Sequence, residues 1–244
     1  MPLCEIKGLT KYFGGLAAVN KIDLEIDAGE IVGIIGPNGA GKTTLLNLIS
    51  GYHKPTAGTI IFKNENITGH KPHYICRKHI ARTFQLTKIL KKLTVLENVM
   101  VGALYQSKKI DGARTEAIKW LEFVSLGEKT NYPVESLTHA DYRRLEIARA
   151  LATQPELLLL DEPLAGLNPR EVLEACDLVR KINMLGITSV IVEHVMKGVM
   201  SLSQRIFVIN YGEKIAEGNP LQIATNEQVI KAYLGKVYVE GKKD

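Results

Sequence analysis

No run of apolar residues in this sequence is long enough to cross a membrane, and no hydrophobic signal-peptide core follows the first methionine. A membrane-spanning helix needs about 18 or more consecutive apolar residues. We therefore expect the chain to stay in the cytoplasm, so that any work at a membrane is done from its surface.

Cysteine is scarce as well, with only Cys4, Cys76 and Cys176 in 244 residues. An odd number of cysteines without metal-ligand spacing excludes a disulfide framework and a cysteine-based zinc site. We expect thiols that are buried or idle in a reducing compartment, and we assign them no chemistry.

Acidic residues are absent between Glu65 and Glu97, although the net charge of the whole chain is only +5. A basic cluster of this kind can be a solvated face, or it can meet a nucleic acid, an anionic membrane surface or an acidic partner. Aromatic residues do not alternate with the lysines, as they would in a groove that binds a nucleic-acid strand. The basic residues of the segment are Lys71, Arg77, Lys78, Arg82, Lys88, Lys91 and Lys92.

Apolar residues make up 45% of the chain and charged residues 23%, which is enough for a buried core. The patterns predict one large α/β domain, with strands at 3–6, 22–26, 30–35, 58–63, 80–84, 157–160 and 189–192 and a terminal hairpin at 205–210 and 213–218. They predict helices at 44–50, 72–79, 142–152, 169–185 and 226–234, and a helical stretch at 94–126 with Gly112 as a break and Trp120 as packed core.

Glycines gather at the end of the predicted strand 30–35 in the pattern GxxxxGK[ST], which opens the next helix. Such a turn lets backbone amides approach a phosphate closely, and the helix dipole favours negative charge there. In this pattern Lys42 reaches the β- and γ-phosphates, and Thr43 offers a hydroxyl to Mg²⁺. The turn consists of Gly36, Pro37, Asn38, Gly39, Ala40, Gly41, Lys42 and Thr43, with Thr44 next.

Two further strands end in polar groups. Four leucines at 157–160 lead to Asp161 and Glu162, and an apolar strand at 189–192 is followed within two residues by His194. Parallel strands bring such ends to one edge of a sheet, where one carboxylate can organise Mg²⁺ and the other can orient or deprotonate a water. His194 is then a candidate contact for the γ-phosphate.

These motifs together resemble the ATP-binding cassette (ABC) ATPases that power membrane transporters, and the resemblance covers almost the whole chain. It is carried by GPNGAGKT, Gln85 after ARTF, LLLLDEP, the AGLNP of residues 165–169, and His194. The strings ARTFQ, LTVLENVMVG, RRLEIARAL, VEH and VIKAYLG are similar to the subunits of branched-chain amino-acid importers.

The resemblance implies a P-loop NTPase fold over residues 1–244, with a mainly parallel core sheet, an N-terminal antiparallel β subdomain, a helical subdomain at about 86–153 and a C-terminal helix at 226–234. Phe13 falls where the family stacks an aromatic ring on adenine, and Gly36 to Thr44 would hold the phosphates. Gln85 would touch Mg²⁺ and the attacking water, Asp161 would hold Mg²⁺ through water, Glu162 would be the catalytic carboxylate, and His194 would contact the γ-phosphate.

The resemblance also implies partners. Such a subunit lies on the inner face of the cell membrane, hydrolyses ATP in a homo- or heterodimer, docks onto transmembrane permease subunits and serves an extracytoplasmic solute-binding protein indirectly. No direct contact with nucleic acid is expected. In such transporters the permease and the binding protein select the solute, so branched-chain or similar small amino acids and amides enter only through the family likeness.

One segment departs from the family pattern. The signature that presses on the partner's ATP resembles LSGGQ in the family, and here it is Leu137, Thr138, His139, Ala140 and Asp141. Ala140 places a Cβ where glycine lets the backbone touch phosphate, whereas Thr138 keeps a hydroxyl donor. Asp141 either repels a triphosphate or sits in the first turn of the following helix and interacts with its dipole. A weak signature would favour an asymmetric heterodimer.

Two other functions remain open. A soluble ABC-type ATPase acting on nucleic acid or the ribosome would suit the basic segment, but this chain has neither the long coiled coils nor the second cassette of such relatives. A regulatory subunit with weakened hydrolysis would suit Ala140 and Asp141. Against it, the chain keeps all four residues that hydrolysis would need, which are Lys42, Asp161, Glu162 and His194.

Overall fold

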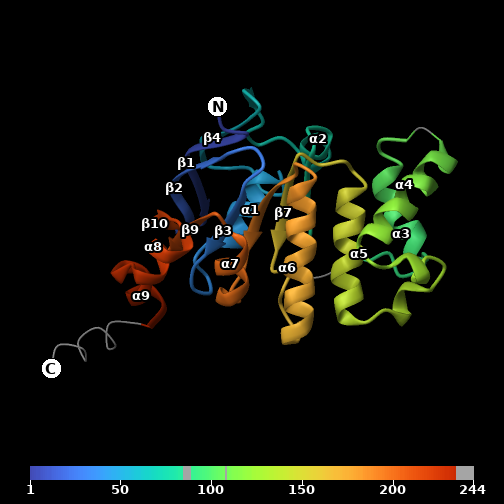
Figure 1. The fold of residues 1–244 in the computed structure, drawn as a ribbon. Helices are drawn as coiled ribbons and strands as arrows, with labels where there is room; N and C mark the ends of the chain where they lie inside the picture. The colour runs from blue at the N-terminus through green and yellow to red at the C-terminus, as the bar shows by residue number, and fades with distance from the viewer. Residues whose placement is uncertain (85–88, 108, 235–244) are drawn as a thin grey trace.

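The computed structural model describes residues 1–84, 89–107 and 109–234 of the chain. At its centre lies a six-stranded sheet with the strand order β10-β9-β3-β8-β7-β6 (Figure 1). Neighbouring strands run parallel from β9 through β6, and β10 closes the far edge antiparallel to β9. The strands are β3 (Ile31–Ile35), β6 (Ile80–Arg82), β7 (Leu157–Asp161), β8 (Thr188–Val192), β9 (Arg205–Asn210) and β10 (Glu213–Gly218).

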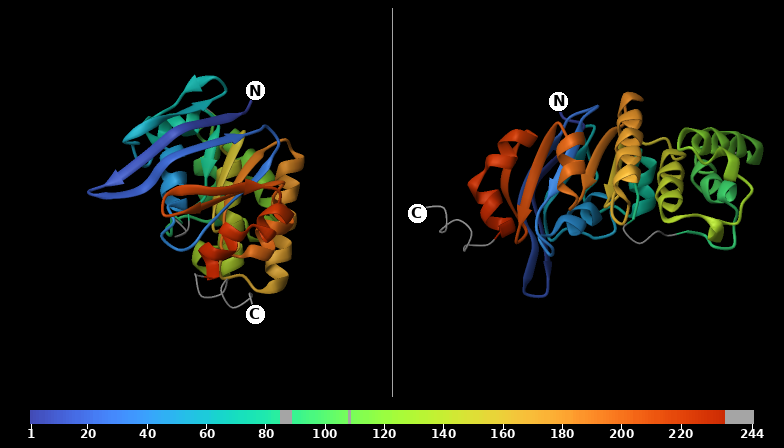
Figure 2. Two further views of the ribbon diagram at one scale, coloured as in Figure 1. Left: turned by 90° about the vertical axis from the view of Figure 1, so that its left-hand side faces the viewer. Right: turned by 60° about the horizontal axis from the view of Figure 1, so that its bottom comes forward.

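A second, antiparallel sheet of four strands has the order β2-β1-β4-β5. Its strands are β1 (Cys4–Phe13), β2 (Leu16–Ile26), β4 (Ala57–Phe62) and β5 (Glu65–Asn66). The hairpin of β1 and β2 projects beyond the body of the fold (Figure 2). Phe13 lies at the end of β1, next to the turn of this hairpin.

Helices cover both faces of the six-stranded sheet, which explains why β3, β7 and β8 are buried along their whole length. Leu157 and Leu159 face α1 (Lys42–Ile49) and the antiparallel sheet, whereas Leu158 and Leu160 face α6 (Pro169–Met184) and the helices beyond it. The shorter helices α7 (Met196–Leu202), α8 (Pro220–Thr225) and α9 (Glu227–Leu234) pack near β9 and β10.

Three helices pack together beside the sheet: α3 (Val95–Ala103), α4 (Ile110–Phe123) and α5 (His139–Leu151) (Figure 1). Gly102 allows a close approach of α3 to α5, because a Cβ on it would lie 2.3 Å from the backbone oxygen of Arg149. Trp120 is only 7% exposed and belongs to this core, as predicted. The remaining helical turns are α2 (Pro72–Arg77) and two 3-10 turns, η1 (Gly127–Lys129) and η2 (Val134–Ser136).

Local details differ from the sequence prediction. Helix α3 ends at Ala103 and α4 begins at Ile110, so Gly112 is not the break but lies inside α4. Packing against α3 and α5 holds that helix together despite the glycine. Helix α5 begins three residues before Tyr142, since Thr138 caps it. The short helices α7 and α8 were not predicted, because neither has enough residues to show a helical period. No helix among the described residues has the length and apolar character that a membrane crossing requires.

Candidate functional site

The glycine-rich turn joins β3 to α1, and close packing against other strands holds it. A Cβ on Gly36 would lie 2.0 Å from the backbone oxygen of Ile209, and one on Gly41 would lie 2.2 Å from that of Ala18. Gly41 also has a φ of 105°, a conformation that favours glycine, and it is the N-cap of α1. Neither position therefore has room for a Cβ atom, and the backbone conformation of Gly41 also favours glycine.

Lys42 is the first residue of α1, and its side chain folds back over the turn. Its ammonium donates hydrogen bonds to the backbone oxygens of Gly36 at 2.8 Å and Pro37 at 2.9 Å. Burial lowers the pKa of Lys42, and the nearby charges of Glu162 and Asp161 oppose that shift. The cation thus lies between the turn and the two carboxylates that the sequence placed at the end of another strand.

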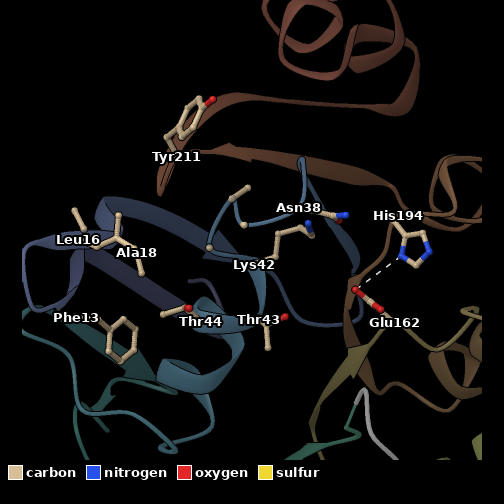
Figure 3. A pocket seen from close by; sticks show the side chains of 14 residues that line it. Phe13, Leu16, Ala18, Asn38, Lys42, Thr43, Thr44, Glu162, His194 and Tyr211 are labelled. Atoms are coloured by element: carbon tan, nitrogen blue, oxygen red, sulfur yellow. Dashed lines mark ion pairs between the residues drawn. The ribbon is translucent and has the colours of Figure 1, made fainter. Parts of the chain in front are cut away.

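A pocket of about 930 Å³ opens above this turn (Figure 3). Phe13 stands at one end of the pocket, Glu162 and His194 at the other, and Lys42 and Thr43 between them. The sequence did not single out four of its lining residues. Leu16, Ala17 and Ala18 come from β2, and no sequence pattern pointed to them. Tyr211 comes from the β9–β10 turn, and its sequence indicated a turn but no contact with a ligand. The full lining is Phe13, Leu16, Ala17, Ala18, Asn38, Gly39, Ala40, Gly41, Lys42, Thr43, Thr44, Glu162, His194 and Tyr211.

Glu162 and His194 follow neighbouring strands, and the structure brings them together. The Nδ1 atom of His194 lies 3.8 Å from Oε1 of Glu162 (Figure 3). Glu162 has a φ of 51°, unusual for a residue other than glycine, and its N–H donates to the backbone oxygen of Val192 at 2.8 Å. Such strained conformations persist where the surrounding structure fixes them, and they cluster at functional sites.

Asp161 does not line the pocket but lies beneath it, 1% exposed. Its Oδ2 accepts a hydrogen bond from Nη2 of Arg82 at 2.7 Å, while its Oδ1 has no hydrogen-bond partner within the described part of the chain. Burial raises the pKa of Asp161, and the ion pair with Arg82 offsets part of that shift. A buried carboxylate oxygen without a partner fits an aspartate that binds a metal ion through water.

Comparison with known proteins shows the family to which this chain belongs. A family model described as ABC transporter matches residues 19–165. The chain is 43% identical to the high-affinity branched-chain amino acid transport ATP-binding protein LivG of Escherichia coli K12, over 96% of this chain and 98% of that protein. It is 42% identical, with the same coverage, to the corresponding protein BraF of Pseudomonas aeruginosa.

This chain belongs to the ATP-binding cassette family. Its predicted fold class is confirmed by solved cassettes of ABC transporters. One in the ADP conformation has a TM-score of 0.89 and 32% identity, covering 97% of this chain and all of that one. A dimeric cassette bound to ADP and Pi has a TM-score of 0.81 and 29% identity over 89% of this chain. The chain is therefore an ATPase of the ABC type. A second model, described as Branched-chain amino acid ATP-binding cassette transporter, matches residues 213–239.

Gln85 of the predicted cassette site falls outside the described residues. Thr138 and Ala140 stand at the start of α5 and do not line the pocket of their own chain. Next to them, Nε2 of His139 lies 3.1 Å from the backbone oxygen of Ala165, so the signature segment touches the loop that follows Glu162.

Of the two interpretations of Asp141, the structure shows the helix-capping one. Asp141 and Thr138 form a reciprocal capping box at the start of α5. Oδ2 of Asp141 also pairs with Nζ of Lys129 at 2.5 Å. Burial works against the charged form, but hydrogen bonds from Lys129 and Thr138 outweigh it and hold the pKa of Asp141 below its ordinary value. This pairing reduces the repulsion that the other interpretation predicts between Asp141 and a triphosphate.

We expect Asp141→Asn to lower the free energy of unfolding by about 1 kcal/mol at pH 7, because the capping box and the ion pair are weakened. The folded-state pKa is depressed, so this contribution is present above the unfolded pKa of about 4 and is lost as pH falls through the lower folded pKa. Urea unfolding of both proteins between pH 7 and pH 3 measures it. A difference that stays constant down to pH 3 would contradict the assignment.

Proposed function

We propose that this chain is the ATP-hydrolysing subunit of an importer for branched-chain or similar small amino acids or amides, bound at the inner face of the cell membrane. The match of residues 213–239 to the branched-chain cassette model supports the solute class, as do the relatives named above. The convergence of Lys42, Glu162 and His194 on one pocket supports hydrolysis. We propose no role in nucleic-acid binding.

ATP fits the pocket with its base toward Phe13, an exposed ring beside the β1–β2 turn, and its phosphates over the glycine-rich turn. The backbone N–H groups of residues 38–44, which include the start of α1, would face the phosphates, where the helix dipole favours anions. Phosphate oxygens are charged and therefore stronger acceptors for the Lys42 ammonium than the two carbonyl oxygens that it now contacts. Lys42 then neutralises charge on the β- and γ-phosphates.

When bound, Mg²⁺ would neutralise part of the negative charge on the phosphates during the reaction. The hydroxyl of Thr43, the unpartnered Oδ1 of Asp161 and, by family resemblance, the amide of Gln85 would hold the ion. Glu162 orients and deprotonates the attacking water, and His194, whose Nδ1 lies 3.8 Å from Oε1 of Glu162, contacts the γ-phosphate. Arg82 fixes the orientation of the Asp161 carboxylate by holding its other oxygen.

A groove lies between strand β6 of the six-stranded sheet and helices α3 and α5. This groove is where we propose that the permease binds. Its exposed apolar side chains include Tyr52, Val101 and Tyr105, and its basic side chains include Arg77 and Arg149. Phe84, which precedes the Gln85 segment, also lines it. A helical or loop segment of the permease with apolar side chains and an acidic group would fit this chemistry. The basic residues of segment 65–97 thus serve in part as a partner surface.

In the assembled transporter with its solute-binding protein, leucine, isoleucine or valine should stimulate ATP turnover. Glu162→Gln should lower that turnover at least a hundredfold, because the amide cannot accept a proton from water. Its affinity for ATP should stay within about threefold of the wild-type value. Single-turnover hydrolysis and nucleotide-binding titrations measure the two quantities. Stimulation by nucleic acid or ribosomes in place of an amino acid would contradict the proposed function.

A charge in the groove should disrupt permease binding. Val101→Glu places a carboxylate among apolar side chains that we expect to be buried on docking, and the desolvation of that charge disfavours the complex. We expect at least a fivefold loss of copurified permease, with unchanged ATP binding by the isolated subunit. Leu221→Glu, at an exposed apolar residue of α8, is the matched control and should keep the permease. Equal retention by both variants would contradict the assignment of the groove.

The signature segment of one subunit faces the ATP of the other in the dimer that the family forms. Because Asp141 is paired with Lys129, the weakness of this signature depends mainly on the Cβ of Ala140. We expect Ala140→Gly to raise ATP turnover of the assembled transporter severalfold, whereas Ala140→Ser should not. Turnover is measured at saturating ATP. Unchanged turnover in the glycine variant would remove the case for an asymmetric heterodimer.

A further inference from the structure

Glu193 is a buried carboxylate that the function described above does not use. It follows β8 directly, is 0% exposed, and accepts three backbone hydrogen bonds. Its Oε1 accepts from the N–H of Leu164 at 2.5 Å, and its Oε2 accepts from those of His194 at 3.0 Å and Val195 at 3.2 Å. Burial raises the pKa of Glu193, and the three N–H donors counteract that shift.

The donors come from two different loops. Leu164 belongs to the loop at 163–168, which follows Glu162, and Asn168 ends that loop as the N-cap of α6. His194 and Val195 belong to the turn that leads from β8 into α7. One carboxylate oxygen accepts from the first loop and the other oxygen accepts from the second, so the side chain bridges the two loops. Hydrogen bonds to a charged acceptor are about twice as strong as neutral ones.

This bridge determines where His194 can lie. The His194 side chain is 53% exposed, and its Nδ1 lies 3.9 Å from Oε2 of Glu193, so Glu193 is close to both the backbone and the ring of this residue. Its backbone N–H donates to Glu193, and its Nδ1 lies 3.8 Å from Glu162 on the other loop. The same loop reaches the signature segment through the contact of Ala165 with His139.

We propose that Glu193 is a positioning residue that fixes His194 relative to the loop at 163–168, so that a displacement of either loop is transmitted to the other. Within one subunit, the signature segment and the histidine beside Glu162 are thereby connected. The catalytic part of the proposal rests on the role proposed above for His194; the bridge itself rests on the hydrogen bonds alone.

Hydrogen exchange in the full-length, nucleotide-free protein tests the bridge without catalysis. Glu193→Gln keeps the shape but presents an NH₂ group to one set of donors, which breaks the bridge. Amide exchange should therefore rise about tenfold in residues 164–168 and 193–196 together. Glu30→Gln is the control, because Glu30 pairs with Arg205 at the opposite end of the same sheet. A rise in one loop alone, or in neither, would overturn the bridge.

Single-turnover kinetics test the link to His194. Glu193→Gln should lower the hydrolysis rate more than tenfold while the dissociation constant for ATP stays within twofold, and it should have no further effect in a His194→Ala background. The same rate loss in both backgrounds would show that Glu193 does not act through His194. A His194→Ala protein with the wild-type rate would instead overturn the role of His194 and the catalytic part of this proposal.

A second variant keeps these tests decisive if Glu193→Gln does not fold. Glu193→Asp retains the charge but is one methylene shorter, so it cannot reach Leu164 and the His194 loop at once. We expect it to raise exchange in both loops, because losing either half of the bridge releases both, to lower the hydrolysis rate, and to have no further effect in the His194→Ala background. Wild-type exchange and rate in this variant would overturn the proposal.

Discussion

The site depends on the parallel arrangement of β3, β7 and β8. Parallel strands all end at the same edge of a sheet, and in this chain each of the three ends in polar residues. The turn after β3 supplies backbone amides and Lys42, β7 supplies Asp161 and Glu162, and β8 leads to Glu193 and His194. Lys42 and His194, which are 152 positions apart in the chain, therefore line one pocket.

Burial of charge accompanies this arrangement. Lys42, Asp161 and Glu193 are each nearly or wholly buried, which is costly for a charged group unless it is paired or hydrogen-bonded. Each is compensated in a different way: Lys42 by carbonyl oxygens, Asp161 by Arg82, and Glu193 by backbone N–H groups. These contacts fix the groups in place, and pre-positioned charge is the main requirement of phosphoryl transfer.

Much of this was predictable from local patterns. The phosphate turn, the leucine strand before Asp161 and the hairpin of β9 and β10 follow from glycine spacing and from runs of apolar residues, which act over a few positions. Other features depend on contacts between distant segments. The break near Gly112 was misplaced because tertiary packing overrides the low helix propensity of one glycine, and Arg82 gave no sign in the sequence that it pairs with Asp161.

The sequence by itself determined the fold class, the family and the residue types at the strand ends, because those follow from the order of motifs and from hydrophobic patterning. The tertiary structure decided which partners the buried charged side chains have. Of the two interpretations of Asp141 that the sequence left open, it showed the helix cap and added the ion pair with Lys129, and it placed Glu193 between two loops. The Thr138–Asp141 cap is local, but the ion pair of Asp141 with Lys129 and the hydrogen bond of Leu164 to Glu193 join residues 12 and 29 positions apart. Those contacts are not encoded locally, because the segments that make them meet only when the chain is folded.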